Sequence, residues 1–318
     1  MTGPTMIGAA DMAGPRPMLR VVDTLTEMFV DLAAGRTRSP ARTVIEHGDE
    51  RVLLVSPAVW ERRGVGSVKI TTLTPDNPGR GLPLIHGIVA LTDLDTGQIT
   101  ALLDGAELTA VRTGAVAAVA TRCCTADDAD DLAVLGAGVQ ARALVRAMTA
   151  VRPIRTVRVF SRTRGRAEQF ADRVRDTHGL RVTVCDSAKA AVADAAIICT
   201  ATSTSDNRPL IEADWVAPGA HVNVIGGTHP DAIELDPAVL ADAVAVVEDR
   251  TAALDGAGEI RAALAAGVLT VDDLHELGAL LDGETRVDGR TSVLRTVGMS
   301  IEDTAAALAL REQAAAVT

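Results

Sequence analysis

A short buried strand that runs directly into a glycine-rich turn is the feature that most constrains the fold. Residues 131–135 read Asp-Leu-Ala-Val-Leu, and Gly-Ala-Gly-Val-Gln-Ala follows at 136–141. Gly136 would allow the tight turn, Gly138 would let the backbone approach a pyrophosphate, and Ala141 would keep the next helix close to the sheet. The first amides of that helix would bind the phosphates. Because the chain holds 27 glycines, a strand-turn-helix connection without a ligand is the alternative.

Residues after Thr125 alternate between buried strands and helical stretches. Because each strand is a continuous apolar run and a helix separates it from the next, the pattern is typical of a parallel, doubly wound sheet covered on both faces. We therefore predict an α/β fold with a Rossmann-type domain at residues 123–296. The predicted strands are 132–135, 157–160, 182–185, 195–200, 222–225 and 244–247, with helices such as 142–150 and 164–177 between them.

The first part of the chain has a different rhythm. Residues 19–34 carry apolar side chains at helical spacing and end at Gly35, which predicts an amphipathic helix. Short strand-like segments follow, so the first 105 residues are predicted to be mainly an antiparallel sheet behind one helix. The predicted strands are 42–45, 52–55, 67–74, 84–92 and 99–103, and alanine-rich helices are predicted at about 106–122 and at 301–315.

Composition and charge argue against several classes of protein. The net charge of −11, with only two tryptophans and three phenylalanines, argues against a nucleic-acid partner. No apolar run reaches membrane-spanning length and residues 1–18 do not resemble a signal peptide, so we expect no membrane partner and a cytoplasmic location. The absence of tyrosine excludes the Tyr-Lys proton relay of short-chain dehydrogenases. The four cysteines lack C-x-x-C spacing, and no metal site is predicted.

The end of the second predicted Rossmann strand indicates which dinucleotide would bind. Enzymes that select NAD usually place an aspartate or glutamate there to bind the ribose 2′-hydroxyl. Ser161 and Arg162 stand at that place, followed by Thr163. A hydroxyl and a guanidinium suit a 2′-phosphate. NADP(H) is therefore the preferred cofactor and NAD(H) a possible one; the alternative is a solvated arginine-rich loop.

Three basic residues of the first domain are candidates for a cationic pocket. Lysine occurs only at Lys69 and Lys189, so 29 of the 31 basic residues are arginine. A lysine retained in such a chain hints that a guanidinium would not serve at its position. Lys69 and Arg42 fall on predicted strands, and Arg112 lies in the helix that leads toward the nucleotide domain. The alternative for each is a solvent-facing side chain.

The chain resembles the ornithine cyclodeaminase/mu-crystallin family over nearly its whole length. Ordered motifs along the chain carry this resemblance and are far more specific than the glycine turn alone. They are Arg42-Thr-Val-Ile, Val68-Lys69-Ile-Thr-Thr, Asp93-Leu-Asp-Thr-Gly97, Leu103-Leu-Asp-Gly-Ala-Glu-Leu-Thr-Ala-Val-Arg-Thr-Gly114, Leu135-Gly-Ala-Gly-Val-Gln-Ala-Arg142, Gly219-Ala-His-Val-Asn-Val-Ile-Gly226, Glu234-Leu-Asp, Glu276-Leu-Gly278, Gly289-Arg290-Thr-Ser and Gly298-Met-Ser-Ile-Glu-Asp303.

The resemblance implies two domains, one that binds the substrate and one that binds the cofactor. Residues 1–122 plus 297–318 would form an α+β domain for substrate binding and dimerisation, into which the Rossmann domain at 123–296 is inserted. Family members handle small amino or imino acids by hydride transfer, so the expected partner is a small imino or amino acid and the expected assembly is a homodimer. The implied cofactor-binding residues are Gly136, Gly138, Val139, Gln140, Ser161, Arg162, Thr163, Thr200, Ala201, Ile225 and Gly226.

The same resemblance gives roles to the basic residues. Arg42 and Arg112 match positions that hold the substrate carboxylate, and Lys69 matches the lysine beside the reacting carbon. Planar guanidinium groups bind carboxylates bidentately. A lysine crowded by two cations should have a lowered pKa, which suits proton transfer near neutral pH.

One departure from the family separates its activities. Cyclodeaminases carry an aspartate where this chain has Thr228, a position at which mu-crystallin-like ketimine reductases often have a small hydroxyl residue. Threonine cannot act as a carboxylate base, although it can orient an imine nitrogen or a water. The expected function is therefore NADPH-dependent reduction of small 2-imino acids. A cyclodeaminase with bound NAD, in which Asp231 takes the missing role, and a non-catalytic protein that binds NADPH and a small ligand are the alternatives.

Overall fold

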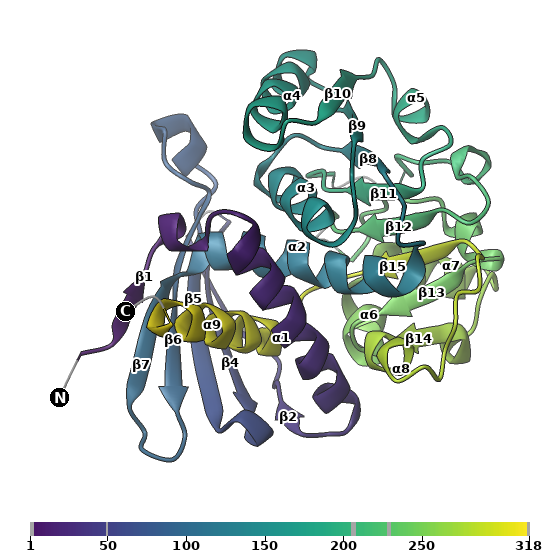
Figure 1. The fold of residues 1–318 in the computed structure, drawn as a ribbon. Coiled ribbons are helices and arrows are strands. Elements are labelled where there is room, and N and C mark those ends of the chain that lie inside the picture. Colours follow the sequence, from purple (N-terminus) through teal and green to yellow (C-terminus); the bar gives the residue numbers. More distant parts are fainter. Residues whose placement is uncertain (1–2, 49, 205–207, 228–229, 317–318) are drawn as a thin grey trace. The chain divides into compact units, whose positions relative to one another are not determined.

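The computed structural model describes residues 3–48, 50–204, 208–227 and 230–316 (Figure 1). The chain divides into two compact units. Unit 1 contains Met1–Arg112 and Gly298–Thr318, and unit 2 contains Thr113–Val297. The chain therefore leaves unit 1, builds unit 2 and returns to unit 1 with its last residues. Each unit has its own sheet.

The sheet of unit 1 is almost wholly antiparallel, as the alternating segments predict. Its described strands have the order β1-β7-β6-β5-β4-β2, and β3 pairs with β4. The exception is the pairing of β1 with β7, which is parallel. The strands are β1 (Thr5–Ile7), β2 (Thr37–Arg38), β3 (Thr43–His47), β4 (Arg51–Trp60), β5 (Val65–Leu73), β6 (Ile85–Asp93) and β7 (Ile99–Asp104).

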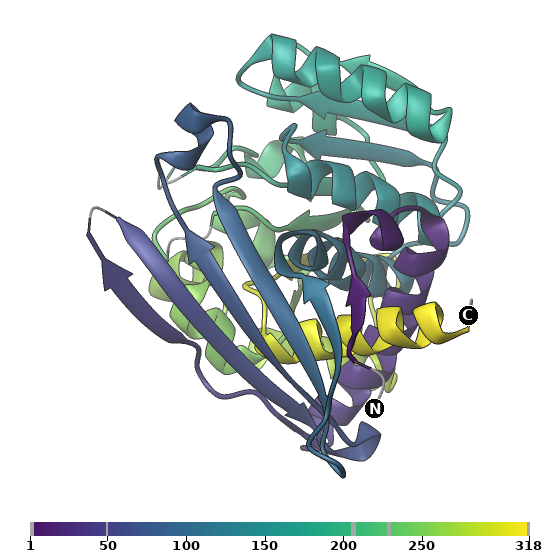
Figure 2. The ribbon, with the colours of Figure 1, turned by 90° about the vertical axis from the view of Figure 1, so that its left-hand side faces the viewer.

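Helices cover one face of this sheet (Figure 2). Helix α9 (Ser300–Ala315) lies against β4, β5 and β6 and packs beside α1 (Pro15–Ala33). Because α9 has neighbours on several sides, its residues from Ser300 to Leu310 are all buried. Helix α1 buries a single stripe that includes Val21, Leu25 and Phe29, as expected for an amphipathic helix. Helix α2 (Gly105–Cys124) follows β7, and short 3₁₀ turns lie at Ala9–Met12, Glu61–Arg63 and Asn77–Arg80.

The sheet of unit 2 is parallel throughout its described pairs, in the order β10-β9-β8-β11-β12-β15-β13-β14. The chain moves outward from β8 through β9 to β10 and then returns to the other side of β8 with β11, so the strand order reverses at β8. This confirms the predicted doubly wound α/β fold. The strands are β8 (Asp131–Leu135), β9 (Thr156–Phe160), β10 (Arg181–Val184), β11 (Ile197–Thr200), β12 (His221–Val224), β13 (Val244–Val247), β14 (Leu274–Glu276) and β15 (Ser292–Arg295).

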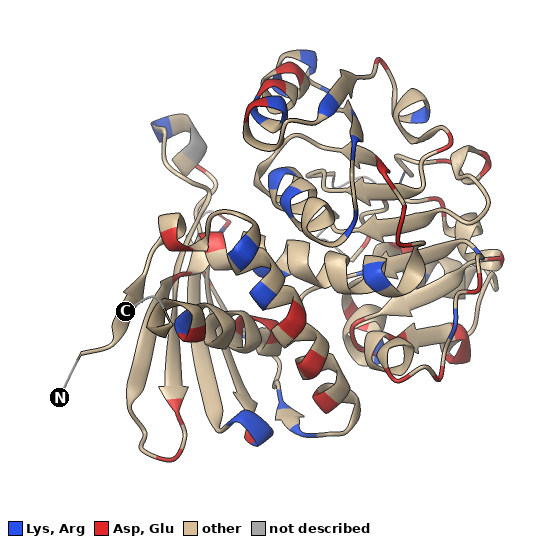
Figure 3. Cartoon of the chain, in the orientation of Figure 1, with Lys and Arg blue, Asp and Glu red and all other residues tan. Residues whose placement is uncertain are grey.

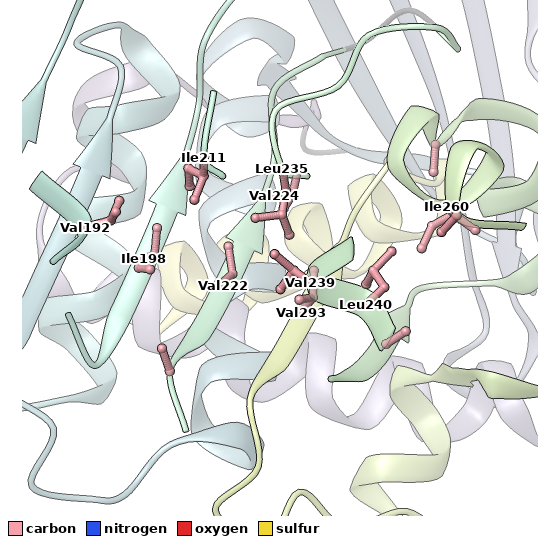
Figure 4. Packing of buried hydrophobic residues seen from close by; sticks show 14 of the residues in the cluster. Val192, Ile198, Ile211, Val222, Val224, Leu235, Val239, Leu240, Ile260 and Val293 are labelled. Carbon is pink, nitrogen blue, oxygen red and sulfur yellow. The ribbon is translucent and has the colours of Figure 1, made fainter. Parts of the chain in front are cut away.

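The core of unit 2 lies between this sheet and its helices (Figure 4). Val222 and Val293, from the neighbouring strands β12 and β15, belong to the same buried cluster as Ile198 of β11. Strands covered on both faces need apolar side chains on both, which explains their continuous apolar runs. The helices are α3 (Val139–Val151), α4 (Arg164–His178), α5 (Ala188–Val192), α6 (Arg250–Gly256), α7 (Gly258–Ala265) and α8 (Leu277–Leu281), with 3₁₀ turns at Ala213–Trp215, Pro237–Ala241 and Val271–Asp273.

A chain of buried polar side chains surrounds His221 on β12. The imidazole Nδ1 lies 2.9 Å from Ser292 Oγ, and Nε2 lies 3.2 Å from Asn223 Oδ1. Asn223 Nδ2 in turn donates to Thr121 Oγ1 over 3.1 Å. Because burial disfavours the imidazolium, the pKa of His221 is lowered to about 4. His221 is therefore neutral in the folded protein at every pH in the ordinary working range.

This buried imidazole is expected to make unit 2 sensitive to mild acid. Below its usual pKa of about 6.5, His221 takes up a proton in the unfolded chain but not in the folded one, so the free energy of unfolding falls as the pH drops toward 4. Between pH 7 and pH 5 the loss is about 2 kcal/mol, and above pH 7 it vanishes. Urea unfolding at both pH values should show that His221→Gln lacks this loss. His47→Gln, at an exposed position, should behave as the wild type; equal pH dependence in both variants would contradict the prediction.

Candidate active site and cofactor-binding edge

The glycine turn has the geometry that its sequence predicts. Gly136 has a φ of +121°, and a Cβ at this position would overlap the carbonyl oxygen of Ala201. Only glycine fits there. Gly138 is different, because no described heavy atom lies within 4 Å of the place where its Cβ would be. It precedes Val139, where α3 begins without a hydrogen bond from a capping side chain. The first amides of α3 are thus presented beside open space, as phosphate binding requires.

The residues after β9 also lie at the surface. Ser161 is half-buried, and Arg162 and Thr163 are exposed. Three arginines and no carboxylate line a nearby cavity of about 280 Å³, which extends between the start of α3 and one side of α4. The cavity is therefore cationic. Its lining includes Gly138, Val139, Arg142, Arg166, Phe170 and Arg173.

The remaining predicted cofactor residues lie where β11 and β12 end. Thr200 closes β11 and Ala201 follows it, whereas Ile225 and Gly226 come directly after β12. Strand β11 lies between β8 and β12, all three parallel. Their carboxyl ends therefore form one edge of the sheet, at the point where the strand order reverses, which is the usual dinucleotide site of such a sheet.

Two observations show that this edge fits a dinucleotide. A Cβ would have open space at Gly138, so a ligand has room to approach the backbone there. The side-chain oxygen Oε1 of Gln140 is buried and has no hydrogen-bond partner among the described residues. A buried polar atom in this state costs free energy unless a ligand or water satisfies it.

The three basic residues of unit 1 gather around the start of α9. Lys69 Nζ on β5 lies 2.7 Å from Asp303 Oδ2, and Arg112 Nη1 on α2 lies 2.8 Å from Glu302 Oε2. The side chains of Lys69 and Arg112 are only 11% and 10% exposed. Arg42, just before β3, donates to the carbonyl oxygen of Gly298 over 2.7 Å. Sequence positions far apart thus form one cluster at a single helix end.

Gly298 explains how closely the two arginines approach the start of α9. Its φ is +78°, and a Cβ here would lie 2.8 Å from Arg112 Nη1. Its carbonyl oxygen accepts the hydrogen bond from Arg42. A larger residue at this position would displace the Arg112 guanidinium.

The sequence analysis missed Glu302 and Asp303 as members of this cluster. Both carboxylates are buried in the first turn of α9, and Asp303 Oδ1 also lies 3.4 Å from Arg112 Nε. Buried carboxylates need charged or hydrogen-bonding partners, which Lys69 and Arg112 supply. A signal was present in the sequence, because an acidic pair stands at the start of an otherwise alanine- and leucine-rich helix.

The environment of Lys69 lowers its pKa, in the direction that the sequence predicts. Burial of the ammonium is the largest cause, and the charges of Arg112 and Arg42 act in the same direction. Asp303 opposes them, because its carboxylate favours the charged lysine. The crowding by two cations that the sequence suggested is thus a real but secondary cause.

Thr228 and Asp231 are the remaining residues considered for the predicted site. Thr228 lies outside the described residues, and its role stays a prediction. Asp231, considered as its substitute, is an exposed turn residue of unit 2.

In the described part of the chain, no cluster of three or more His, Cys, Asp or Glu side chains is arranged to hold a metal ion. The same residues include no helix with the length and apolar character needed to cross a bilayer.

Comparisons with known proteins show the family to which the chain belongs. The family model for the ornithine cyclodeaminase/mu-crystallin family matches residues 4–317. A Delta(1)-pyrroline-2-carboxylate reductase of Bacillus cereus is 33% identical over 290 residues, 89% of this chain and 88% of the relative. The ketimine reductase mu-crystallin of Mus musculus is 35% identical over 275 residues, 86% and 84% of the two chains.

A solved structure supports the same assignment. The Delta(1)-pyrroline-2-carboxylate reductase of Thermococcus litoralis, in complex with NADH and L-proline, superposes with a TM-score of 0.90. It is 29% identical, and the match covers 98% of each chain. These likenesses extend over both units and confirm the family resemblance expected from the motifs. The chain belongs to the ornithine cyclodeaminase/mu-crystallin family.

Proposed function

We propose that this chain is an NADPH-dependent reductase that converts small 2-imino acids, such as pyrroline- or piperideine-2-carboxylate, to amino acids. The observation that carries the proposal is the cluster of Lys69, Arg112 and the exposed Arg42, in which one cation can give up a proton and the others can bind a carboxylate. Relatives that reduce pyrroline-2-carboxylate and other ketimines, similar over most of the chain, support it. Unit 1 would bind the substrate, and unit 2 would bind the cofactor.

In unit 1, different residues bind the carboxylate of the imino acid and protonate its imine nitrogen. Arg42 and Arg112 bind the carboxylate, because a planar guanidinium can form two parallel hydrogen bonds with a carboxylate. The Lys69 ammonium hydrogen-bonds the imine nitrogen and donates a proton to it. NADPH, when bound, supplies the hydride that adds to the imine carbon. The C=N double bond becomes an amine, and the neutral Lys69 regains its proton from solvent. Thr228 orients the nitrogen or a water.

NADP(H) is our preferred cofactor because of the residues that follow β9, where the adenosine half of the dinucleotide would bind. Ser161 offers a hydroxyl and Arg162 a guanidinium to a 2′-phosphate. The cavity with Arg142, Arg166 and Arg173 adds positive charge near the same end. The solved relative from Thermococcus litoralis was determined with NADH, so NAD(H) is the competing cofactor.

The direct test follows NADPH absorbance during reaction with pyrroline- and piperideine-2-carboxylate. We expect turnover with both cofactors and a higher kcat/KM with NADPH than with NADH. Release of ammonia from ornithine without net change of the cofactor, and no reduction of any ketimine, would identify a cyclodeaminase instead. Tight binding of NADPH with no turnover of any imino acid would identify a binding protein.

We also propose that the chain acts as a homodimer through the face of the unit 1 sheet that α9 does not cover. Val68, Ile70 and Ile88 are exposed there, and Ile70 and Ile88 lie directly opposite each other on β5 and β6. The ribbons of these strands carry few charges (Figure 3). An uncovered antiparallel sheet normally presents polar side chains, and a large exposed apolar patch marks an interface. A second copy of the chain would cover it by two-fold symmetry.

The mass of the protein in solution tests this interface. Sedimentation equilibrium should give twice the chain mass for the wild type, and Ile70→Glu should shift it to the chain mass because two buried charges would face each other. Val271→Glu places the same charge at an exposed apolar site of unit 2 and should leave the dimer intact. A monomeric wild type would refute the proposal.

The cysteines support the proposed cytoplasmic location. All four are free thiols, and burial raises the pKa of Cys124 and Cys199 to about 12. Such thiols are unreactive packing groups. Proteins that work in reducing compartments commonly keep their cysteines in this form.

A further inference from the structure

The carboxylate of Glu234 joins two loops at the cofactor-binding edge of unit 2. Glu234 follows β12 by ten residues and is fully buried. Its Oε2 accepts a hydrogen bond from Thr200 Oγ1 over 2.7 Å, and its Oε1 accepts from the amide of Thr202 over 2.8 Å and from the hydroxyl of the same threonine. Three donors from the end of β11 and the loop after it thus converge on one side chain.

The same carboxylate also contacts the loop that follows β12. A Cβ at Gly226 would overlap both carboxylate oxygens of Glu234, so the backbone of this loop lies directly against the side chain. Glu234 therefore links the residues at the end of β11 to the backbone at Gly226 through direct contacts.

A second set of contacts fixes Glu234 itself. Its backbone amide donates to Glu259 Oε1 over 2.6 Å, and Glu259 Oε2 lies 2.7 Å from Arg295 Nε. Arg295 Nη2 then donates to the carbonyl oxygen of Gly227 over 2.7 Å. These contacts lead from Glu234 through Glu259 and Arg295 to Gly227, and both Glu234 and Gly227 follow β12. Such a closed buried network holds its members in one arrangement because each lost bond would leave a polar group unsatisfied.

We infer that Glu234 is a positioning residue for the nicotinamide half of the cofactor. The inference rests on the proposed function, which places the cofactor along this edge. In a doubly wound sheet each half binds one mononucleotide. The glycine turn after β8 and the Ser161-Arg162 pair after β9 belong to the adenosine half. The loops that Glu234 joins lie beyond the reversal of strand order, in the other half.

The test compares NADPH with 2′-phospho-ADP-ribose, a fragment that lacks nicotinamide. Glutamine has the size of glutamate but replaces one accepting oxygen by an amide nitrogen, so Glu234→Gln loses at least one of its accepted hydrogen bonds. We expect Glu234→Gln to weaken NADPH binding about tenfold in calorimetric titration. Binding of the fragment should stay unchanged, because the adenosine half does not depend on Glu234.

Two other variants calibrate this comparison. Arg162→Ala should weaken NADPH and the fragment to the same extent, because both carry the 2′-phosphate. Glu212→Gln removes an exposed carboxylate of the same unit and should change neither. A Glu234→Gln protein that loses affinity for both ligands equally, or for neither, would overturn the positioning role. A wild type that binds neither NADPH nor the fragment would overturn the proposed function, and the inference with it.

Discussion

A Lys69→Met enzyme is expected to bind NADPH normally and to lose about a thousandfold in kcat for imine reduction. Methionine matches the length of lysine but has no proton to donate to the imine nitrogen. Asp303 keeps its contact with Arg112, so the buried carboxylate is not left without a cation. The measurements are steady-state NADPH oxidation and titration of NADPH fluorescence. The loss should fall mainly on kcat, because Lys69 acts most strongly in the transition state.

The chain contains its own matched control. Lys189 is the other lysine, with a side chain that is 62% exposed and an ammonium 5.6 Å from the ring centre of Trp215. Lys189→Met makes the same chemical change outside the cluster and should leave kcat unchanged. A Lys69→Met enzyme that keeps kcat within a factor of about three would remove the proton-donor role from the mechanism.

Arg112→Lys is expected to lower kcat/KM for the imino acid by about thirtyfold, chiefly through KM. The substitution keeps the positive charge beside Glu302, so that carboxylate retains a cation. It removes the planar fork that binds a carboxylate with two parallel hydrogen bonds. One lost charged hydrogen bond is worth about 2 kcal/mol, which sets the size of the effect. Steady-state kinetics with varied imino acid and saturating NADPH measures it.

Arg152 is the control for the effect of burial alone. It is a buried arginine of unit 2, and it donates to Thr125 Oγ1 and to backbone carbonyls around the end of α2. Arg152→Lys should lower Tm, as Arg112→Lys also will, but should leave KM for the imino acid unchanged. Equal KM values for the two variants would show that Arg112 does not bind the substrate carboxylate.

Most of the fold follows from periodicity, and the exceptions are short strands. All six strands predicted for unit 2 are present, because continuous apolar runs between helices have few other arrangements. The two missed strands, β14 and β15, have three and four residues. The two middle residues of β15 are apolar, but a serine and an arginine stand at its ends, and their partners come from distant parts of the chain. Strands β1 and β2 in unit 1, with three and two residues, are also too short for a periodic pattern and were missed.

The sequence predicted those members of the candidate site whose residue type or local motif is itself informative. A rare lysine and the motifs around Arg42 and Arg112 indicated the cationic cluster. Glu302 and Asp303 escaped because they join their partners across about 190 and 230 residues of sequence, a pairing that no local pattern reveals. Glu234 escaped likewise, since its importance comes from two loops that meet only in the folded sheet.

The return of the chain to unit 1 has a consequence for its synthesis on the ribosome. Unit 2 ends in the sequence at Val297, whereas unit 1 also needs α9, which is made after unit 2. The inserted unit can therefore fold before the unit that starts the chain. Until α9 docks, Lys69 and Arg112 have no carboxylates beside them, and the apolar face that α9 covers stays open to water. We therefore expect the cluster of Lys69, Arg112, Glu302 and Asp303 to form only after α9 has been made and has docked.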